Sequence, residues 1–195
     1  MELRKLIEGS ACILPGHKEE FIACLEKFPK VDDWLYGVPA DAGFLYQGDL
    51  LFDVPVCLID SEGDVIKGKD RVAMISNTCD MQPGRKENVV ASVVFTLADH
   101  ADLLKAQGIT DEGMEERLRN IRENRVFSYF YLPPNGEIPE GFIDLSTMVT
   151  INSDYMNSAY TEKRVLSLSR NGFYLFLIKL TFHLARIEQP LQNPI

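Results

Sequence analysis

A cysteine, an aspartate and a histidine stand directly after two predicted strands, where they could form a catalytic cluster. Cys79 and Asp80 follow the apolar segment 71–76, and His100 follows the next apolar segment, 88–95. A cysteine thiol becomes a good nucleophile when a neighbouring base lowers its pKa, and histidine is such a base. The structural alternative stays open, because an aspartate such as Asp80 also caps the turn after a strand.

The pattern of apolar and turn-forming residues predicts the elements that must position these side chains. Segment 88–95 is rich in β-branched residues, which favours a strand. Within the helical segment 97–125, Gly108 ends one helix and Thr110 can cap the next. We expect strands at 50–59 (bent or bulged near Pro55), 71–76, 88–95, 126–132 and 142–151, and helices at 17–28, 98–107, 110–125 and 170–186.

The order of these elements predicts the α+β class. Short strands separated by turn signals, with few connections long enough to join parallel strands, indicate a small antiparallel barrel. Residues 1–47 are predicted to form an N-terminal extension of one helix and loops. The barrel domain then spans 48–195, with a helical insertion at 97–125 and a C-terminal helix.

The chain of 195 residues is acidic, and its charge is unevenly spread. The net charge is −9; residues 1–70 contain 7 Lys or Arg against 14 Asp or Glu, and residues 71–195 contain 13 against 15. Proteins that bind nucleic acid usually present a basic field, so this balance argues against a large nucleic-acid footprint. It allows a small basic groove in the second part, and it allows the acidic first third to bind a basic protein.

The cysteines and glycines carry no recognisable metal or nucleotide motif. The four cysteines show no CxxC spacing, and the glycines form no phosphate-binding loop. We therefore expect neither a metal nor a cofactor. The N-terminus has no signal-peptide core, and the longest apolar run, 173–178, is far too short for a membrane span. These features predict a cytoplasmic protein with reduced thiols and no membrane partner.

Residues 48–96 resemble the first half of the MazF/PemK toxin family. A Gly-Asp pair at 48–49 opens an apolar strand, Arg71 leads a second apolar strand that ends at Ser76, and a β-branched strand ends at Thr96. Members of that family share this order of motifs. The resemblance implies a small SH3-like barrel with helices, and a homodimer as the usual assembly.

The same resemblance implies metal-independent cleavage of single-stranded RNA by Arg71 and Thr96. An arginine can hold the scissile phosphate through two hydrogen bonds and stabilise the charge that develops there. The threonine hydroxyl can hold or relay a proton while the ribose 2′-hydroxyl attacks. From the residues alone, Arg71 is equally a charge at a strand end, and Thr96 is equally an N-cap of the next helix. Ser76, Arg85 and Lys86 are further candidates for phosphate binding.

Three functions therefore stay open at the level of the sequence. The first is a diverged MazF/PemK-like protein of a bacterial or phage conflict system, of the toxin–antitoxin or defence kind, that acts on single-stranded RNA as an endoribonuclease. The second is a non-catalytic acidic antitoxin or immunity protein that neutralises a basic partner protein. The third is an enzyme built on Cys79, Asp80 and His100.

Overall fold

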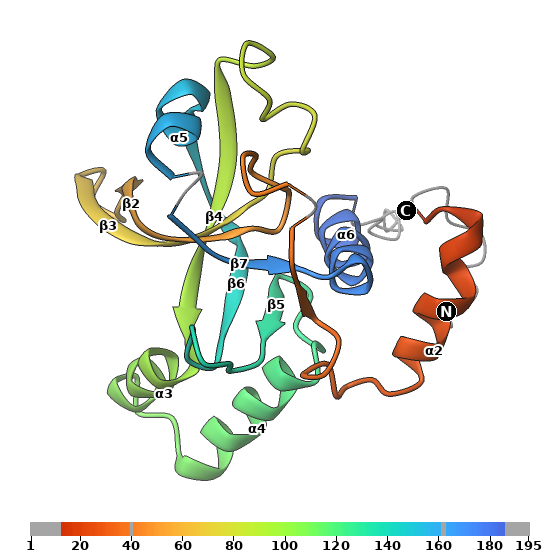
Figure 1. Ribbon diagram of the computed structural model, residues 1–195. Helices are drawn as coiled ribbons and strands as arrows, with labels where there is room; N and C mark the ends of the chain where they lie inside the picture. Colours follow the sequence, from red (N-terminus) through yellow and green to blue (C-terminus); the bar gives the residue numbers. More distant parts are fainter. Residues whose placement is uncertain (1–12, 40, 161–162, 186–195) are drawn as a thin grey trace, which may run out of the picture.

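The structure is a computed structural model that describes residues 13–39, 41–160 and 163–185 (Figure 1). The first twelve residues, which begin the predicted N-terminal extension, lie outside the described residues, as does Arg186, the predicted last residue of the C-terminal helix. Among the described helices, none combines the length and the apolar character of a membrane span.

Strands and helices mix along the chain. The strands are β1 (Tyr36–Gly37), β2 (Leu50–Ile59), β3 (Val65–Met74), β4 (Asn88–Thr96), β5 (Tyr129–Leu132), β6 (Gly141–Asn152) and β7 (Arg164–Leu168). The helices are the short 3-10 helix η1 (Pro15–His17), α2 (Lys18–Leu25), α3 (Leu97–Ala106), α4 (Asp111–Arg122), α5 (Ser153–Tyr160) and α6 (Arg170–Leu184). This mixture confirms the predicted α+β class. Sequence analysis did not predict α5, β7 or the two-residue β1.

The seven strands form one antiparallel sheet in the order β1-β7-β2-β3-β4-β6-β5. The sheet is curved, but it is open, because its end strands β1 and β5 do not pair with each other. These end strands are two and four residues long, which leaves little edge to close a cylinder. The antiparallel sheet was predicted correctly, whereas the closed barrel is not seen.

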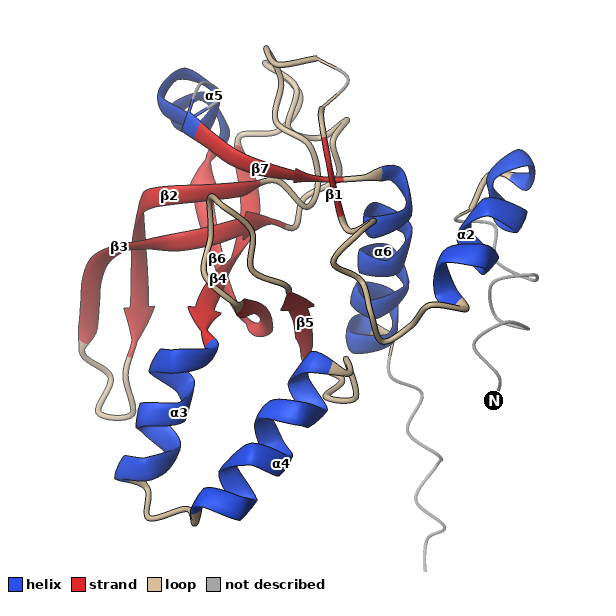
Figure 2. Cartoon of the chain, turned by 60° about the horizontal axis from the view of Figure 1, so that its bottom comes forward, coloured by secondary structure: helices blue, strands red, loops and turns tan. Residues whose placement is uncertain are grey.

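Alternation along the central strands divides the apolar side chains between two cores. Leu50 and Ala73, which are paired across β2 and β3, belong to the larger core, together with residues of α2, α4 and α6. Leu51 and Val72, the next pair, belong to a smaller core that α5 covers. Successive side chains of a strand point to opposite faces, so burial on both faces requires the continuous apolar run predicted at 71–76. Figure 2 shows the helices grouped around the sheet.

The described part of the N-terminal extension packs against the C-terminal helix. Phe21 of α2 is fully buried, and its ring meets the ring of Tyr174 edge to face at 5.7 Å between centroids. Nδ1 of His17 lies 2.6 Å from the hydroxyl oxygen of the same Tyr174. Figures 1 and 2 show α2 beside α6, on the side of that helix away from the sheet. The predicted extension therefore contributes to the larger core.

Each predicted helix start that carries a Ser or Thr has the cap geometry expected for it. The hydroxyl oxygens of Thr96, Thr110 and Ser169 accept hydrogen bonds from backbone N–H groups three residues later. At the other end of the insertion, Arg122 of α4 donates two hydrogen bonds to Glu140, at 2.8 and 2.9 Å. The Arg122 guanidinium lowers the pKa of Glu140, so this ion pair anchors α4 against the loop before β6.

We expect Gly172→Ala to destabilise the fold, because the new Cβ would lie 2.1 Å from the carbonyl oxygen of Leu35. Backbone must move to accept it, and we expect a loss of about 3 kcal/mol in the free energy of unfolding by urea. The control is Gly136→Ala, where the added Cβ has no neighbour within 4 Å and a change of at most about 0.5 kcal/mol is expected. Equal stabilities for both variants would contradict the close packing of α6 on Leu35.

Candidate functional site

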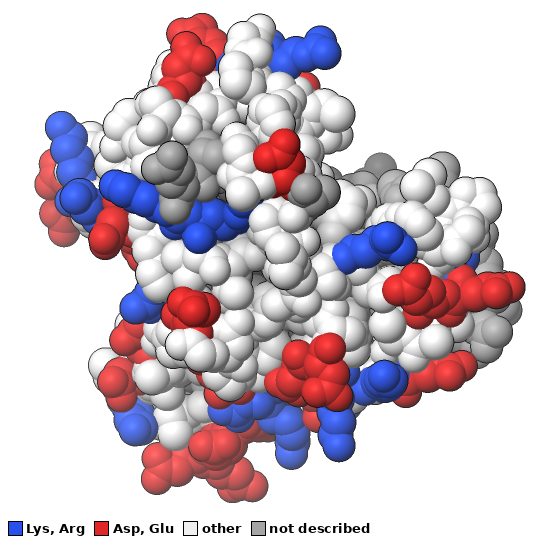
Figure 3. Space-filling model, in the orientation of Figure 1, with Lys and Arg blue, Asp and Glu red and all other residues white. Residues whose placement is uncertain are grey.

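Three basic residues alternate along β3 and share one face of it. Lys67, Lys69 and Arg71 occupy every second position, and side chains two positions apart on a strand point to the same side. Lys67 and Lys69 are exposed, and Arg71 is half-buried. Figure 3 shows Lys and Arg side chains over the β2–β3 hairpin, with acidic side chains among them, and at the start of β7. Acidic side chains are numerous over α2, α3 and α4, and basic side chains also occur over α3 and α4. Lys67, Lys69 and Arg71 therefore form a row of cations on β3, although the net charge of the whole chain is negative.

A β-bulge in β2 sets the surroundings of Arg71. Leu51 pairs with Val72 and Val54 pairs with Asp70, so Phe52 and Asp53 together oppose the single residue Arg71. Asp53 takes a positive φ of 56°, a conformation that aspartate adopts more readily than most residues. The bulge brings the Phe52 ring to 5.3 Å from the guanidinium carbon of Arg71, within the range of a cation–π contact. The predicted irregularity is thus present, slightly before Pro55.

Arg71 and Thr96, the pair that the resemblance implies, line the same cleft. Val72 of β3 pairs with Val93 of β4, so Thr96 lies at the end of β4 about two residues beyond the position that faces Arg71. The cleft is narrow, with a volume of about 10 Å³, room for about one water molecule. Its other lining residues are Leu50, Phe52, Val72, Val94, Phe95, Ile138, Pro139 and Gly141.

The hydroxyl group of Thr96 also caps α3. Its oxygen accepts a hydrogen bond from the backbone N–H of Asp99 at 2.9 Å, and the residue is 9 % exposed. A hydroxyl group can accept two hydrogen bonds and donate one, so this cap leaves the O–H proton of Thr96 free to donate. The cap that sequence analysis offered as an alternative is present, and it is compatible with a polar role at the cleft.

The other predicted phosphate-binding residues lie at the far end of β4. Ser76 Oγ accepts a hydrogen bond from the backbone N–H of Val90 at 2.8 Å, near the beginning of that strand. Arg85 and Lys86 are exposed in the loop that enters β4. Thr96 is the last residue of the nine-residue β4, roughly 25 Å further along at about 3.3 Å per residue. The structure therefore does not bring these three residues to the Arg71 cleft.

The structure also separates Cys79 and Asp80 from His100. Both Cys79 and Asp80 are exposed in the loop before β4, whereas His100 belongs to α3, which follows that strand (Figure 1). The backbone N–H of Cys79 donates a hydrogen bond to Asn77 Oδ1 at 3.3 Å, as in an Asx turn. The proposed nucleophile and base therefore stand at opposite ends of β4 and do not form a cluster.

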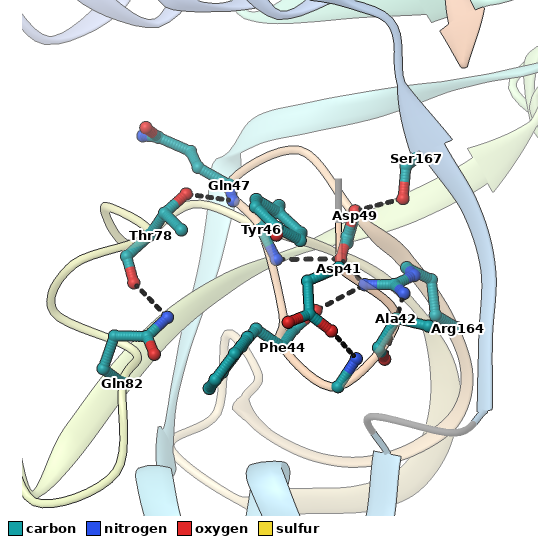
Figure 4. Close-up of polar contacts among 11 residues, drawn as sticks. Asp41, Ala42, Phe44, Tyr46, Gln47, Asp49, Thr78, Gln82, Arg164 and Ser167 are labelled. Atoms are coloured by element: carbon teal, nitrogen blue, oxygen red, sulfur yellow. Dashed lines mark hydrogen bonds and ion pairs between the residues drawn. The ribbon is translucent and has the colours of Figure 1, made fainter. Parts of the chain in front are cut away.

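Sequence analysis did not predict a buried acidic group, Asp49, at the start of β2. This residue is 1 % exposed, and its Oδ1 accepts a hydrogen bond from the hydroxyl group of Ser167 at 2.6 Å. Its Oδ2 accepts from the backbone N–H of Tyr46 at 2.8 Å and from Nη1 of Arg164 at 2.9 Å (Figure 4). The Gly-Asp pair at 48–49 predicted the start of a strand. The burial of the Asp49 side chain was not predicted from it.

The Asp49–Arg164 pair is an internal ion pair joined by several further hydrogen bonds. Burial raises the pKa of the Asp49 carboxyl group, and the hydrogen bonds from Ser167, Tyr46 and Arg164 oppose that rise. The Arg164 side chain is itself 8 % exposed, and it also donates to the carbonyl oxygens of Ala42 and Phe44. The carboxylate is thus held by three donors, which marks it as a structural centre.

A cavity of about 460 Å³ lies beside this ion pair. Its polar lining includes Thr78, whose Oγ1 accepts a hydrogen bond from the backbone N–H of Gln47 at 3.1 Å (Figure 4). The volume is in the range of small-molecule sites. The remaining lining residues are Gly37, Val38, Pro39, Tyr46, Asp49, Ser167, Leu168, Ser169, Arg170 and Phe173.

Comparisons with known proteins add no family to this description. No protein-family model matches the chain, and no curated protein sequence matches it. Within the described residues, no three His, Cys, Asp or Glu side chains gather as a group that could hold a metal ion.

We expect Arg164→Gln to lower the free energy of unfolding by about 3–5 kcal/mol at pH 7, because it leaves the Asp49 carboxylate buried without its cation. Loss of that cation removes a group that holds the pKa of the Asp49 carboxyl group down, so this pKa lies further above that of the unfolded chain than in the wild type. The stability of the variant therefore falls as the pH rises from 5 to 7, more steeply than that of the wild type. Urea unfolding at both pH values measures this.

Two controls accompany that experiment. Arg170→Gln removes an exposed arginine that lies 3.6 Å from Glu20, and a change within about 1 kcal/mol is expected. The double variant Asp49→Asn with Arg164→Gln replaces the ion pair by two amides and should recover part of the lost stability. If Arg164→Gln behaved like Arg170→Gln at pH 7, the ion pair would not be a structural centre.

Proposed function

We propose that the chain binds single-stranded RNA along the basic face of β3 and cleaves it, without a metal ion, at the cleft between Arg71 and Thr96. The observation that supports this most directly is that those two residues line one cleft, at the end of a row of cations on β3. The MazF/PemK resemblance implies the same pair and the same activity. On this proposal the protein belongs with the RNA-acting toxins of bacterial or phage conflict systems.

The arrangement of the cleft supports a transesterification within the RNA. Because the cleft has room for only about one water molecule, the scissile phosphate would lie at its mouth, where Arg71 would hold the non-bridging oxygens and stabilise the charge that develops on them. The ribose 2′-oxygen attacks phosphorus, the bond from phosphorus to the 5′-oxygen breaks, and the products are a 2′,3′-cyclic phosphate and a 5′-hydroxyl group. The 2′-hydroxyl proton ends on the departing 5′-oxygen, and Thr96, whose O–H is not used by its cap, can relay it.

The charge distribution supports a short RNA footprint. Lys67, Lys69 and Arg71 offer contacts for about three phosphates, and each contact to a single strand changes the slope of log K against log salt by about −0.7. Acidic side chains over α3 and α4 disfavour a longer path for the RNA (Figure 3). We therefore expect moderate affinity that falls steeply with salt.

The N-terminal extension leaves the cleft open in the described residues. The lining of the Arg71–Thr96 cleft includes no residue of 13–47; the described part of that segment instead lines the cavity beside Asp49 or packs on α6. An acidic extension that filled the cleft would have favoured an antitoxin or immunity role. Binding of a basic protein is the competing function, and a failure of the folded wild type to bind RNA would favour it.

The first test measures binding of a fluorescein-labelled single-stranded RNA of mixed sequence by fluorescence anisotropy over a series of salt concentrations. We expect Lys67→Gln with Lys69→Gln to weaken binding about tenfold at low salt and to reduce the slope by about 1.4. The matched control, Lys105→Gln with Arg119→Gln, removes two exposed cations of α3 and α4 and should bind like the wild type. Equal losses in both double variants, or no RNA binding by a folded wild type, would refute the proposed face.

The second test follows cleavage of the same RNA on a gel in the presence of EDTA. We expect Arg71→Gln to abolish cleavage, because the phosphate loses its cation. Thr96→Ser keeps both the cap and the hydroxyl group and should cleave like the wild type, whereas Thr96→Asn keeps the cap but removes the hydroxyl group and should be slower by at least tenfold. Full activity of Thr96→Asn would show that Thr96 only caps α3. If the wild type binds RNA but does not cleave it, the function is RNA binding without cleavage.

A further inference from the structure

A second cavity, of about 420 Å³, lies between α3, α4 and β5. Figure 2 shows the two helices side by side at one end of the sheet. Leu104 of α3 and Ile121 of α4 are buried in the larger core and form part of its wall. The other lining residues are His100, Leu103, Gln107, Arg117, Asn120, Val126 and Tyr129.

Four polar side chains line this cavity with unused hydrogen-bonding capacity. The side chains of His100, Gln107, Arg117 and Asn120 make no hydrogen bond and no ion pair with the described part of the chain. Arg117 is the only Lys, Arg, Asp or Glu among the lining residues that the structure describes. A concave apolar site with a few convergent polar groups is the usual form of a small-molecule site.

The types of these side chains favour a nucleotide. An amide group offers donors and an acceptor side by side, which is the pattern that reads the edge of a base. Asn120 and Gln107 supply two such groups. Tyr129, whose ring packs against Phe142 at 4.4 Å between centroids, supplies an aromatic ring of the kind that contacts bases. The Arg117 guanidinium is suited to hold a phosphate through two hydrogen bonds. Apolar walls, base-reading amides and a single cation thus occur together.

We propose that this cavity binds a ribonucleoside 5′-monophosphate, with the base between α3 and α4 and the phosphate on Arg117. The nucleotide can be free, or it can be one residue of an RNA. The second source would deepen the proposed function, because α3 begins after Thr96 and His100 lies about 6 Å further along the helix axis. Binding of the free nucleotide does not depend on RNA cleavage.

The experiment titrates the ¹⁵N-labelled full chain with each of the four ribonucleoside 5′-monophosphates and follows the amide resonances of α3 and α4. We expect saturable shifts there, with ribose 5-phosphate alone and the nucleosides alone binding at least tenfold more weakly. Arg117→Gln should weaken binding at least tenfold. The control Arg119→Gln removes an exposed arginine two residues away, on the opposite side of α4, and should bind like the wild type.

Two further readouts separate binding from a structural effect of the substitutions. Asn120→Asp replaces the donating NH₂ group by an acceptor and should change the order of preference among the four bases. Burial and the nearby Arg117 lower the pKa of His100, so a phosphate bound to Arg117 should raise that pKa in the wild type and not in Arg117→Gln. A base order that Asn120→Asp leaves unchanged would refute the role of the amide.

An uncleavable 2′-O-methyl tetranucleotide distinguishes the two sources of the nucleotide. Shifts at the same residues with this RNA identify an RNA residue as the occupant, and shifts with the mononucleotides alone identify a free nucleotide. The proposal is overturned if none of these ligands shifts α3 and α4 while the spectrum shows a folded protein, or if Arg117→Gln binds like the wild type. Because no step is cleavage, a failure here is distinct from a failure of the endoribonuclease proposal.

Discussion

The buried carboxylate of Asp49 is the interaction on which the arrangement of the sheet depends. Leaving such a charge unpaired inside a protein costs several kcal/mol, so the fold must deliver donors to it. Those donors come from β7, in Arg164 and Ser167, and from the turn before β2, in the N–H of Tyr46. The backbone of Asp49 also accepts a hydrogen bond from Met74 of β3. One residue thus fixes β7, β2 and β3 side by side.

The register between β2 and β3 then determines which face of the sheet carries Lys67, Lys69 and Arg71. Because the bulge at Phe52 and Asp53 restores the alternation on both sides of it, Leu51 and Val54 face the same small core while Phe52 lies under Arg71. Without that extra residue, half of β2 would present its apolar side chains to the wrong face. β3 in turn pairs with β4 from Val72 and Val93 onward, and Arg71 and Thr96, which lie just outside these pairs, line one cleft.

Patterns among neighbouring residues predicted most of the strands and helices. The positions of the candidate site residues depend on packing between distant parts of the chain. The β-branched run of β4 and the caps of α3 and α4 depend on neighbouring residues, so the sequence revealed them. The short β7 carries no such pattern, since its place depends on the distant Asp49. The start of α5 does carry a local signal, because Asn152 Oδ1 accepts a hydrogen bond from the backbone N–H of Tyr155, but this helix was not predicted. Cys79 and His100 looked close because 71–76 and 88–95 are adjacent strands, but they leave opposite ends of β4.

The acidic balance of the whole chain is a poor guide to what one face of it can bind. At physiological ionic strength the field of an exposed charge is screened over about 8 Å, so a phosphate at β3 responds mainly to the nearby charges. These are the cations Lys67, Lys69 and Arg71 together with the carboxylates of Asp70 and Asp53 beside them. Acidic side chains on α2, α3 and α4 act at longer range and mainly slow the approach of an anion. The consequence is selectivity for a short, single-stranded ligand that can reach between these surfaces, since a long uniform polyanion would have to lie along the acidic helices as well.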